Sequence, residues 1–347
     1  MKFNQFKFKP ILFQSIGVFS NQALAFLLGV IIIRVSGLEL MGQYAEYISL
    51  FNLSFVVLTS GLYTNYLRSN RNKLFGQTIA AVSIIFLFFL FFLLPIYSLI
   101  SGDSFINSVL VLISLYLMKL SEIYVVKTRL MSKDIYSILP RIVPYVFVII
   151  LCLFFKPQNI ESFLFLLSLS WFTIVFFIFK SRRLIKFNKN GILKVLSSSF
   201  LITTTTLTTQ IYANVDQLMI AQLFDYNALG SYKVGISFSV IAMPIIGVFT
   251  FIYISEIKKI IENSDVSILK TKFYNQLKIN FIISFLFFLF SVFFLKSIIF
   301  LVYGIEDSSA ASNIGIVLSI GVIFNVISIV FSYSLLAINK DKLILII

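Results

Sequence analysis

The sequence predicts an all-α polytopic membrane protein with about ten transmembrane helices, and three observations carry this prediction. Of the 347 residues, 59% are hydrophobic and 12% are charged, with a mean hydropathy of +1.00, whereas soluble domains carry about 25% charged residues. Apolar runs of about 20 residues, the length that crosses a bilayer, recur along the whole chain. The connections between these runs alternate between many basic residues and few.

Ten apolar runs define the predicted spans, and short polar or basic connections separate them. In chain order they are residues 11–33, 44–67, 75–100, 105–126, 135–155, 162–179, 195–223, 229–254, 279–302 and 314–338. The first run resembles a signal peptide with a cleavage site after Ala25, but it continues to Ile33 and is longer than the apolar core of such a signal. We therefore expect it to be a span. The connections on both sides are short, so function is expected inside the helix bundle.

The basic residues predict the orientation of the chain. If the N-terminus is cytoplasmic, 24 of the 28 Lys and Arg residues fall on the cytoplasmic side and four on the other: Arg34, Lys156, Lys233 and Lys296. This bias follows the positive-inside rule and predicts that both termini are cytoplasmic. The net charge of +14 is then explained by topology and by contact with anionic lipids, and no nucleic-acid partner is expected.

Missing residue types exclude several kinds of chemistry. The chain has no histidine, so no imidazole serves as a general base or as a metal ligand. Cys152 is the single cysteine, which excludes an intrachain disulfide and a cysteine-ligated metal. No phosphate-binding glycine-rich loop is present, and the chain lacks the large outer loop in which a membrane polysaccharide polymerase would carry catalytic groups. We predict that the protein is not an enzyme and binds no metal.

An internal repeat divides the chain into two lobes. Residues 41–49 (MGQYAEYIS) match residues 229–237 (LGSYKVGIS) at an offset of 188, and the same offset places Gln22 opposite Gln210. Six spans separate the copies, and an even number indicates a parallel repeat about an axis along the membrane normal. The predicted lobes are residues 1–190, with six helices, and residues 191–347, with four helices and the start of a fifth.

The motifs around these repeats resemble a known family. Residues 34–44 (RVSGLELMGQY) and residues 214–220 (NVDQLMI), together with Met243 and Pro244, are similar to polysaccharide-export flippases of the MOP superfamily, Wzx type. The resemblance implies two lobes around a central cavity. It also implies that undecaprenyl-diphosphate-linked oligosaccharide units are moved from the inner to the outer leaflet of the cytoplasmic (inner) membrane, for O-antigen or capsule synthesis. Compared with the family's two six-helix lobes, the second lobe is expected to be incomplete, because the sequence stops inside its fifth helix.

The same resemblance implies the partners of the protein. These are a lipid-linked oligosaccharide, membrane lipids, and polysaccharide polymerase and chain-length proteins. No cofactor is expected, and an H⁺ or Na⁺ gradient is the implied energy source. Two alternatives stay open: a cation-coupled multidrug-type exporter of the same superfamily, with Asp216 as its coupling site, and a nonfunctional truncated remnant.

Polar and ionisable residues within the spans are the candidate lining of a substrate cavity, because such groups are costly in lipid and usually face a cavity or one another. The uncharged candidates are Gln14, Asn21 and Gln22 in the first span and Gln210 and Gln217 in the seventh. Hydrogen bonding between helices, without a substrate, is the competing explanation for these side chains.

The charged candidates are Arg34, Glu46, Lys119, Glu122, Arg141, Asp216 and Lys233. Lys119 and Glu122 are three residues apart and can neutralise each other on one helix face. Arg141, between two prolines near the cytoplasmic side, suits a diphosphate through its bidentate fork, although a long basic side chain can also extend to the lipid headgroups. Arg34, Glu46 and Lys233 lie near the outer boundary of the membrane, and their side chains can likewise extend to the lipid headgroups.

Overall fold

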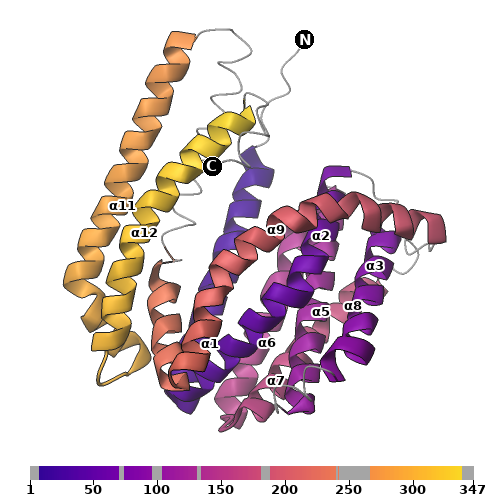
Figure 1. The fold of residues 1–347 in the computed structure, drawn as a ribbon, viewed down its shortest axis with the longest axis horizontal. Coiled ribbons are helices and arrows are strands. Elements are labelled where there is room, and N and C mark those ends of the chain that lie inside the picture. Colours follow the sequence, from indigo (N-terminus) through magenta and orange to yellow (C-terminus); the bar gives the residue numbers. More distant parts are fainter. Residues whose placement is uncertain are drawn as a thin grey trace. The chain divides into compact units, whose positions relative to one another are not determined.

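The structure is a computed structural model that describes residues 8–69, 74–95, 104–130, 134–180, 188–239, 241 and 266–337. In these ranges the chain is helical and contains no strand, so the predicted fold class is confirmed (Figure 1). The elements are α1 (Phe8–Phe51), η1 (Asn52–Val56), α2 (Val57–Ser69), α3 (Phe75–Phe88), η3 (Phe89–Leu93), α5 (Phe105–Leu130), α6 (Asp134–Phe155), α7 (Ile160–Trp171), α8 (Thr173–Phe179), α9 (Lys189–Leu223), α11 (Val266–Tyr303) and α12 (Ser309–Ala337). A further helix covers residues 226–239.

Seven of the described helical segments are long and apolar enough to cross a membrane. The first two predicted spans, residues 11–33 and 44–67, both overlap one of them, Phe19–Tyr63. The seventh predicted span is helix α9, which is rich in threonine and is not among the seven. Most of the eighth predicted span, residues 229–254, lies outside the described residues. These helices make the chain a multi-pass membrane protein.

The outer connection between the first two spans is shorter than predicted. The sequence suggests a connection of about ten residues from Arg34 to Tyr44, but the chain is helical on both sides of a single kink at Gly37. Gly37 has φ 88° and ψ 177°, a backbone conformation that glycine adopts readily because it has no Cβ. A kink at one residue therefore joins the two helices where the sequence suggested a loop.

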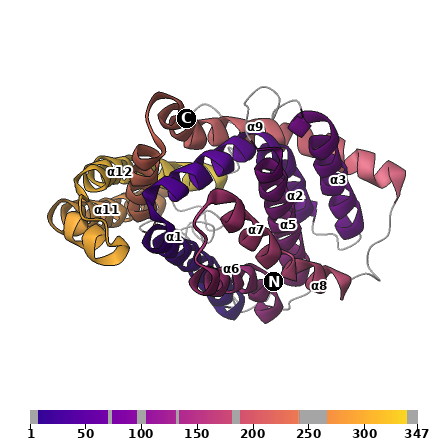
Figure 2. The same cartoon turned by 90° about the horizontal axis from the view of Figure 1, so that it is seen from below.

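The described chain forms two compact units, Met1–Gly230 and Ser231–Ile347. In the first unit, α1 packs against α6, and α5 packs against α3, α6 and α7. Helix α9 belongs to this unit and runs across α2 and α3 (Figures 1 and 2). In the second unit, α11 and α12 pack together. A Cβ added to Gly235 would lie 2.9 Å from the backbone nitrogen of Gly315, so the helix of residues 226–239 contacts α12 through two glycines.

Helix α6 carries two prolines, and its neighbour repairs the backbone bond that one of them removes. Pro144 has no N–H, so the carbonyl of Pro140, one turn earlier, lacks its helical donor. The hydroxyl of Ser121 in α5 donates to this carbonyl at 2.9 Å. Because an unpaired carbonyl is costly where water is absent, this bond both permits the proline and ties α5 to α6.

Candidate functional site

Polar side chains join α9 to the segment that continues α1. Asn52 in η1 donates from Nδ2 to Oδ1 of Asn214 at 3.2 Å. Asn214 donates in turn to the backbone carbonyl and the Oε1 of Gln210, at 2.9 and 3.0 Å. Gln210 was predicted as a site residue from its match with Gln22, whereas Asn52 and Asn214 were not singled out. The sequence feature that could have identified both is an asparagine inside a predicted membrane span.

Closer to the predicted cytoplasmic side, α2 and α9 approach each other through small residues. A Cβ added to Gly61 would lie 2.5 Å from the carbonyl oxygen of Ser199 and 3.0 Å from the nitrogen of Thr203. One turn further, Asn65 donates to the hydroxyls of Ser198 and Ser199, at 2.7 and 3.2 Å. Helix α9 therefore contacts η1 towards its C-terminal end and α2 towards its N-terminal end.

The two copies of the sequence repeat face each other at the predicted outer side. A Cβ added to Gly42 would lie 2.7 Å from the carbonyl carbon of Tyr226 and nearer still to its oxygen. A Cβ added to Gly230 would lie 3.0 Å from the carbonyl carbon of Leu38 and, again, nearer to the oxygen. Both Gly42 with Gly230 and Leu38 with Tyr226 are separated by the repeat offset of 188. Each glycine thus lies against the carbonyl of the residue four positions before the other glycine, so the two contacts are equivalent under the repeat.

The leading candidates in α1 are partly described. Asn21 and Gln22 are half-buried, and the side-chain oxygen of Gln22 is buried without a hydrogen-bond partner among the described residues. Gln14 lies in α1, but its side chain is outside the described part of the structure. Gln210, the predicted counterpart of Gln22, bonds to Asn214 in its own helix. Gln22 therefore remains a candidate for substrate contact, because its buried side-chain oxygen has no hydrogen-bond partner among the described residues.

Near the predicted outer end of α9, Asp216 and Gln217 bond within their own helix. The backbone N–H of Gln217 donates to Oδ1 of Asp216 at 2.8 Å, and its side chain donates to the carbonyl of Ala213 at 3.2 Å. Gln217 is buried and Asp216 is half-buried. These bonds help satisfy the two side chains locally, and they do not by themselves assign a substrate contact.

Lys119 and Glu122 form the ion pair that their spacing suggested. Lys119 Nζ lies 2.8 Å from Glu122 Oε2, and the side chains are 8% and 23% exposed. The pair lies inside α5, so each charge is neutralised where water is scarce. The bond explains how two charges are tolerated in this span without a ligand.

The other charged candidates lie on separate elements. Arg141 is half-buried in α6, directly after Pro140. Arg34 is exposed and Glu46 is half-buried, both in α1, and Lys233 is half-buried in the helix of residues 226–239. A substrate role for each of them remains a prediction.

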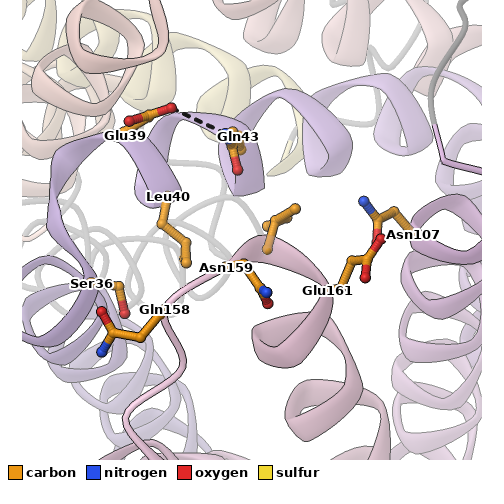
Figure 3. Close-up of a pocket in the computed structure, with 9 residues that line it drawn as sticks. Ser36, Glu39, Leu40, Gln43, Asn107, Gln158, Asn159 and Glu161 are labelled. Atoms are coloured by element: carbon orange, nitrogen blue, oxygen red, sulfur yellow. Dashed lines mark hydrogen bonds between the residues drawn. The ribbon is translucent and has the colours of Figure 1, made fainter.

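A polar pocket that the sequence analysis did not anticipate lies in the first unit, and we call it the outer pocket. Its volume is about 490 Å³, and it is formed by the kinked part of α1, the start of α5 and the turn between α6 and α7 (Figure 3). The lining residues are Ser36, Glu39, Leu40, Gln43, Asn107, Gln158, Asn159, Ile160 and Glu161. None of them is basic, and two are carboxylates. All three segments fall at predicted outer ends of spans.

The described residues include no cluster of three or more His, Cys, Asp or Glu side chains that could hold a metal ion. The amides, hydroxyls and charged side chains described in the first unit form hydrogen bonds and an ion pair. Such groups can bind and orient a polar molecule. This is the kind of surface that a transporter presents to its cargo.

No protein-family model and no curated protein matches the sequence. Solved structures do match the fold. The inward closed conformation of the lipid II flippase MurJ has a TM-score of 0.74 and 19% identity, covering 97% of this chain and 78% of that chain. An inward-facing multidrug resistance MATE transporter of the MOP superfamily has a TM-score of 0.73 and 12% identity, covering 97% and 86%. A MOP superfamily transporter from Pyrococcus furiosus has a TM-score of 0.65 and 12% identity, covering 97% and 84%.

These neighbours are membrane transporters, and each aligns with nearly the whole of this chain. At such low identity the likeness concerns the fold and leaves the cargo open. The helical architecture, the repeated outer turn and the neighbours agree with one another. The chain has the fold of the MOP superfamily transporters.

Proposed function

We propose that the chain is a flippase that moves undecaprenyl-diphosphate-linked oligosaccharide units across the cytoplasmic membrane for the synthesis of O-antigen or capsule. The observation that best supports transport is the reciprocal contact of Gly42 with Tyr226 and of Gly230 with Leu38. At both glycines the repeated turns meet main chain to main chain, so the contact is close and can separate as a unit. Alternating access needs a closure of this kind at one face of the membrane.

A lipid-linked cargo is favoured by the motifs at residues 34–44 and 214–220, which resemble the Wzx type. The likeness to MurJ, a lipid II flippase, supports the same class of cargo. In this proposal the sugar diphosphate passes through polar surroundings while the prenyl chain stays in lipid. The protein then lowers the cost of desolvating the headgroup.

The second candidate function is a cation-coupled exporter of amphiphilic drugs. The likeness to MATE transporters favours it, and Asp216 would be its coupling site. An H⁺ or Na⁺ gradient is part of both proposals. Polymerase and chain-length proteins are proposed partners of the flippase alone.

The test uses the full chain in vesicles that contain a fluorescent lipid-linked oligosaccharide. A membrane-impermeant quencher added outside reports how much label reaches the outer leaflet. We expect the chain to speed this transfer over empty vesicles, and to restore surface polysaccharide in a bacterium that lacks its own repeat-unit flippase. Efflux of a fluorescent cation without lipid transfer would favour the exporter. Neither activity, with the protein folded, would favour the nonfunctional remnant.

The orientation is tested separately with single cysteines in a Cys152→Ala background. An impermeant maleimide should label Asn227→Cys from outside intact cells and label Asn190→Cys after lysis only. Both parent residues are exposed. The reverse pattern would contradict the predicted cytoplasmic termini.

A further inference from the structure

The outer pocket is built from segments that hold one another in place. The hydroxyl of Ser36 in α1 donates to the carbonyl of Pro157 at 2.6 Å, which joins α1 to the turn between α6 and α7. Asn159 starts α7 by accepting a bond from the N–H of Ser162 at 2.9 Å. Gln158 donates to the carbonyl of Lys156 at 3.0 Å. These three bonds shape the wall of the pocket, and none of them uses the Glu161 carboxylate.

The pocket contains acceptors that call for a hydrogen-bond donor, namely two carboxylates and the amide oxygen of Asn107. Asn107 is 5% exposed, and its side-chain oxygen is buried without a hydrogen-bond partner among the described residues. In Figure 3 its amide and the Glu161 carboxylate point toward one another. The amide of Gln43 faces Glu39 at 3.5 Å. A buried carbonyl oxygen left without a donor is costly, so a molecule that donates a hydrogen bond to it binds favourably here.

A neutral, hydroxyl-rich molecule fits these groups better than an anion or a bare cation. The absence of Lys and Arg among the lining residues disfavours a phosphate. The positive end of the α7 helix dipole lies at the lining residues 159–161 and offsets part of the negative charge of Glu39 and Glu161. Leu40 and Ile160 supply apolar surface, and a sugar ring has both hydroxyl groups and an apolar C–H face. The volume of about 490 Å³ lies within the usual range for small-molecule sites, about 300–1,000 Å³.

We infer that the outer pocket binds a neutral sugar unit of the exported oligosaccharide, with Asn107 and Glu161 accepting hydrogen bonds from its hydroxyl groups. This inference rests on the proposed flippase function and names a binding site for the sugar on the predicted outer side. Leu40 and Gln43 flank Gly42 in the same stretch of α1, so the pocket wall adjoins the closure of the outer turns. Sugar bound there is held by the first lobe after it has left the cytoplasmic side.

The binding test uses purified full chain in lipid nanodiscs and lipid-free probes. The probes are the methyl glycosides of glucose, galactose and N-acetylglucosamine, and saturation-transfer NMR measures their binding. We expect at least one of them to bind. Glu161→Gln should weaken that binding about fivefold, because a bond to a charged acceptor is replaced by a bond to a neutral one. Asn107→Leu should abolish it.

The matched control is Glu306→Gln, which changes another exposed glutamate that does not line the pocket. It should leave sugar binding unchanged. If Asn107→Leu fails to fold, Glu39→Gln replaces it, because Glu39 is an exposed lining residue. That variant should weaken sugar binding about as much as Glu161→Gln.

The outcomes separate the site from the proposed function. Sugar binding that depends on the lining residues supports the site, whether or not lipid-linked substrate is transferred in the vesicle assay. Transfer without sugar binding, or with binding that the variants do not change, overturns the site and leaves the flippase proposal standing. Thermal stabilisation by Na⁺ or Ca²⁺ that is lost in Glu161→Gln, with no sugar binding, identifies a cation site and also overturns it.

Discussion

The closure of the outer turns is set by two glycines, and replacing one of them should open it. In Gly42→Ala the new Cβ would lie 2.7 Å from the carbonyl carbon of Tyr226, whereas non-bonded carbon atoms rest at about 3.5–4.0 Å. The two backbones must then separate by about 1 Å. The obstructing atoms belong to the main chain, so no side chain can rotate to relieve the clash.

Overpacking of this kind costs about 1–3 kcal/mol. The cost falls on the state in which the turns touch and is relieved when they separate. The equilibrium between the two states should therefore shift by about 5- to 150-fold toward separation. Gly230→Ala should act in the same direction, because its Cβ would meet the carbonyl of Leu38 in the symmetric way.

The assay is a spin-label distance measurement on the purified chain in nanodiscs. Labels at Glu39→Cys and Asn227→Cys, in a Cys152→Ala background, lie two residues before the two repeat copies, and both parent residues are exposed. Gly42→Ala should increase the population at the longer distance. Gly321→Ala is the matched control, because a Cβ there meets nothing within 4 Å. If Gly42→Ala and Gly321→Ala give the same distance distribution, the glycine contact does not govern closure.

Three further predictions concern the described helices. Ser121→Ala should destabilise the protein by about 1 kcal/mol in an unfolding assay. In a Pro144→Ala background the loss should be much smaller, because the new N–H of residue 144 bonds to the Pro140 carbonyl. Equal losses of stability in the two backgrounds would contradict the role of Ser121 as donor to that carbonyl. Lys119→Met should destabilise by about 3–5 kcal/mol through the unpaired carboxylate, and adding Glu122→Gln should recover part of the loss in the same assay. The Ser309 side chain and N–H hold the pKa of Asp307 below its usual value, so this carboxylate supports the start of α12 at neutral pH. Its support is lost as pH falls through that lowered pKa, and amide exchange in Asp307→Ala should differ from wild type at pH 7 but not in strong acid.

Much of the helix arrangement could be predicted because it depends on local sequence. Apolar runs identify helices long enough to span, and the spacing of Lys119 and Glu122 brings their charges together within one helix. The repeat at an offset of 188 also located the turns that meet in the structure. It did not show that each glycine receives the carbonyl of the opposite copy, because that depends on how two distant segments dock.

The faces of the helices could not be predicted in the same way. In a soluble protein an apolar stripe marks the buried face, but a membrane helix is apolar all round and carries no such pattern. Phe91 and Phe154 are 67% and 81% exposed, although they resemble core residues in sequence. For the same reason nothing in the sequence distinguished Asn107, at the start of a span, from an ordinary surface amide.

That the chain is helical, membrane-spanning and internally repeated follows from the amino-acid sequence, because hydropathy and repetition can be recognised in individual segments. Tertiary structure alone decided the bond of Asn52 to Asn214, the repair of α6 by Ser121, and the outer pocket. In lipid, each polar group needs a partner or a cavity. Which of these it finds depends on residues far away in the chain that packing brings within hydrogen-bonding distance.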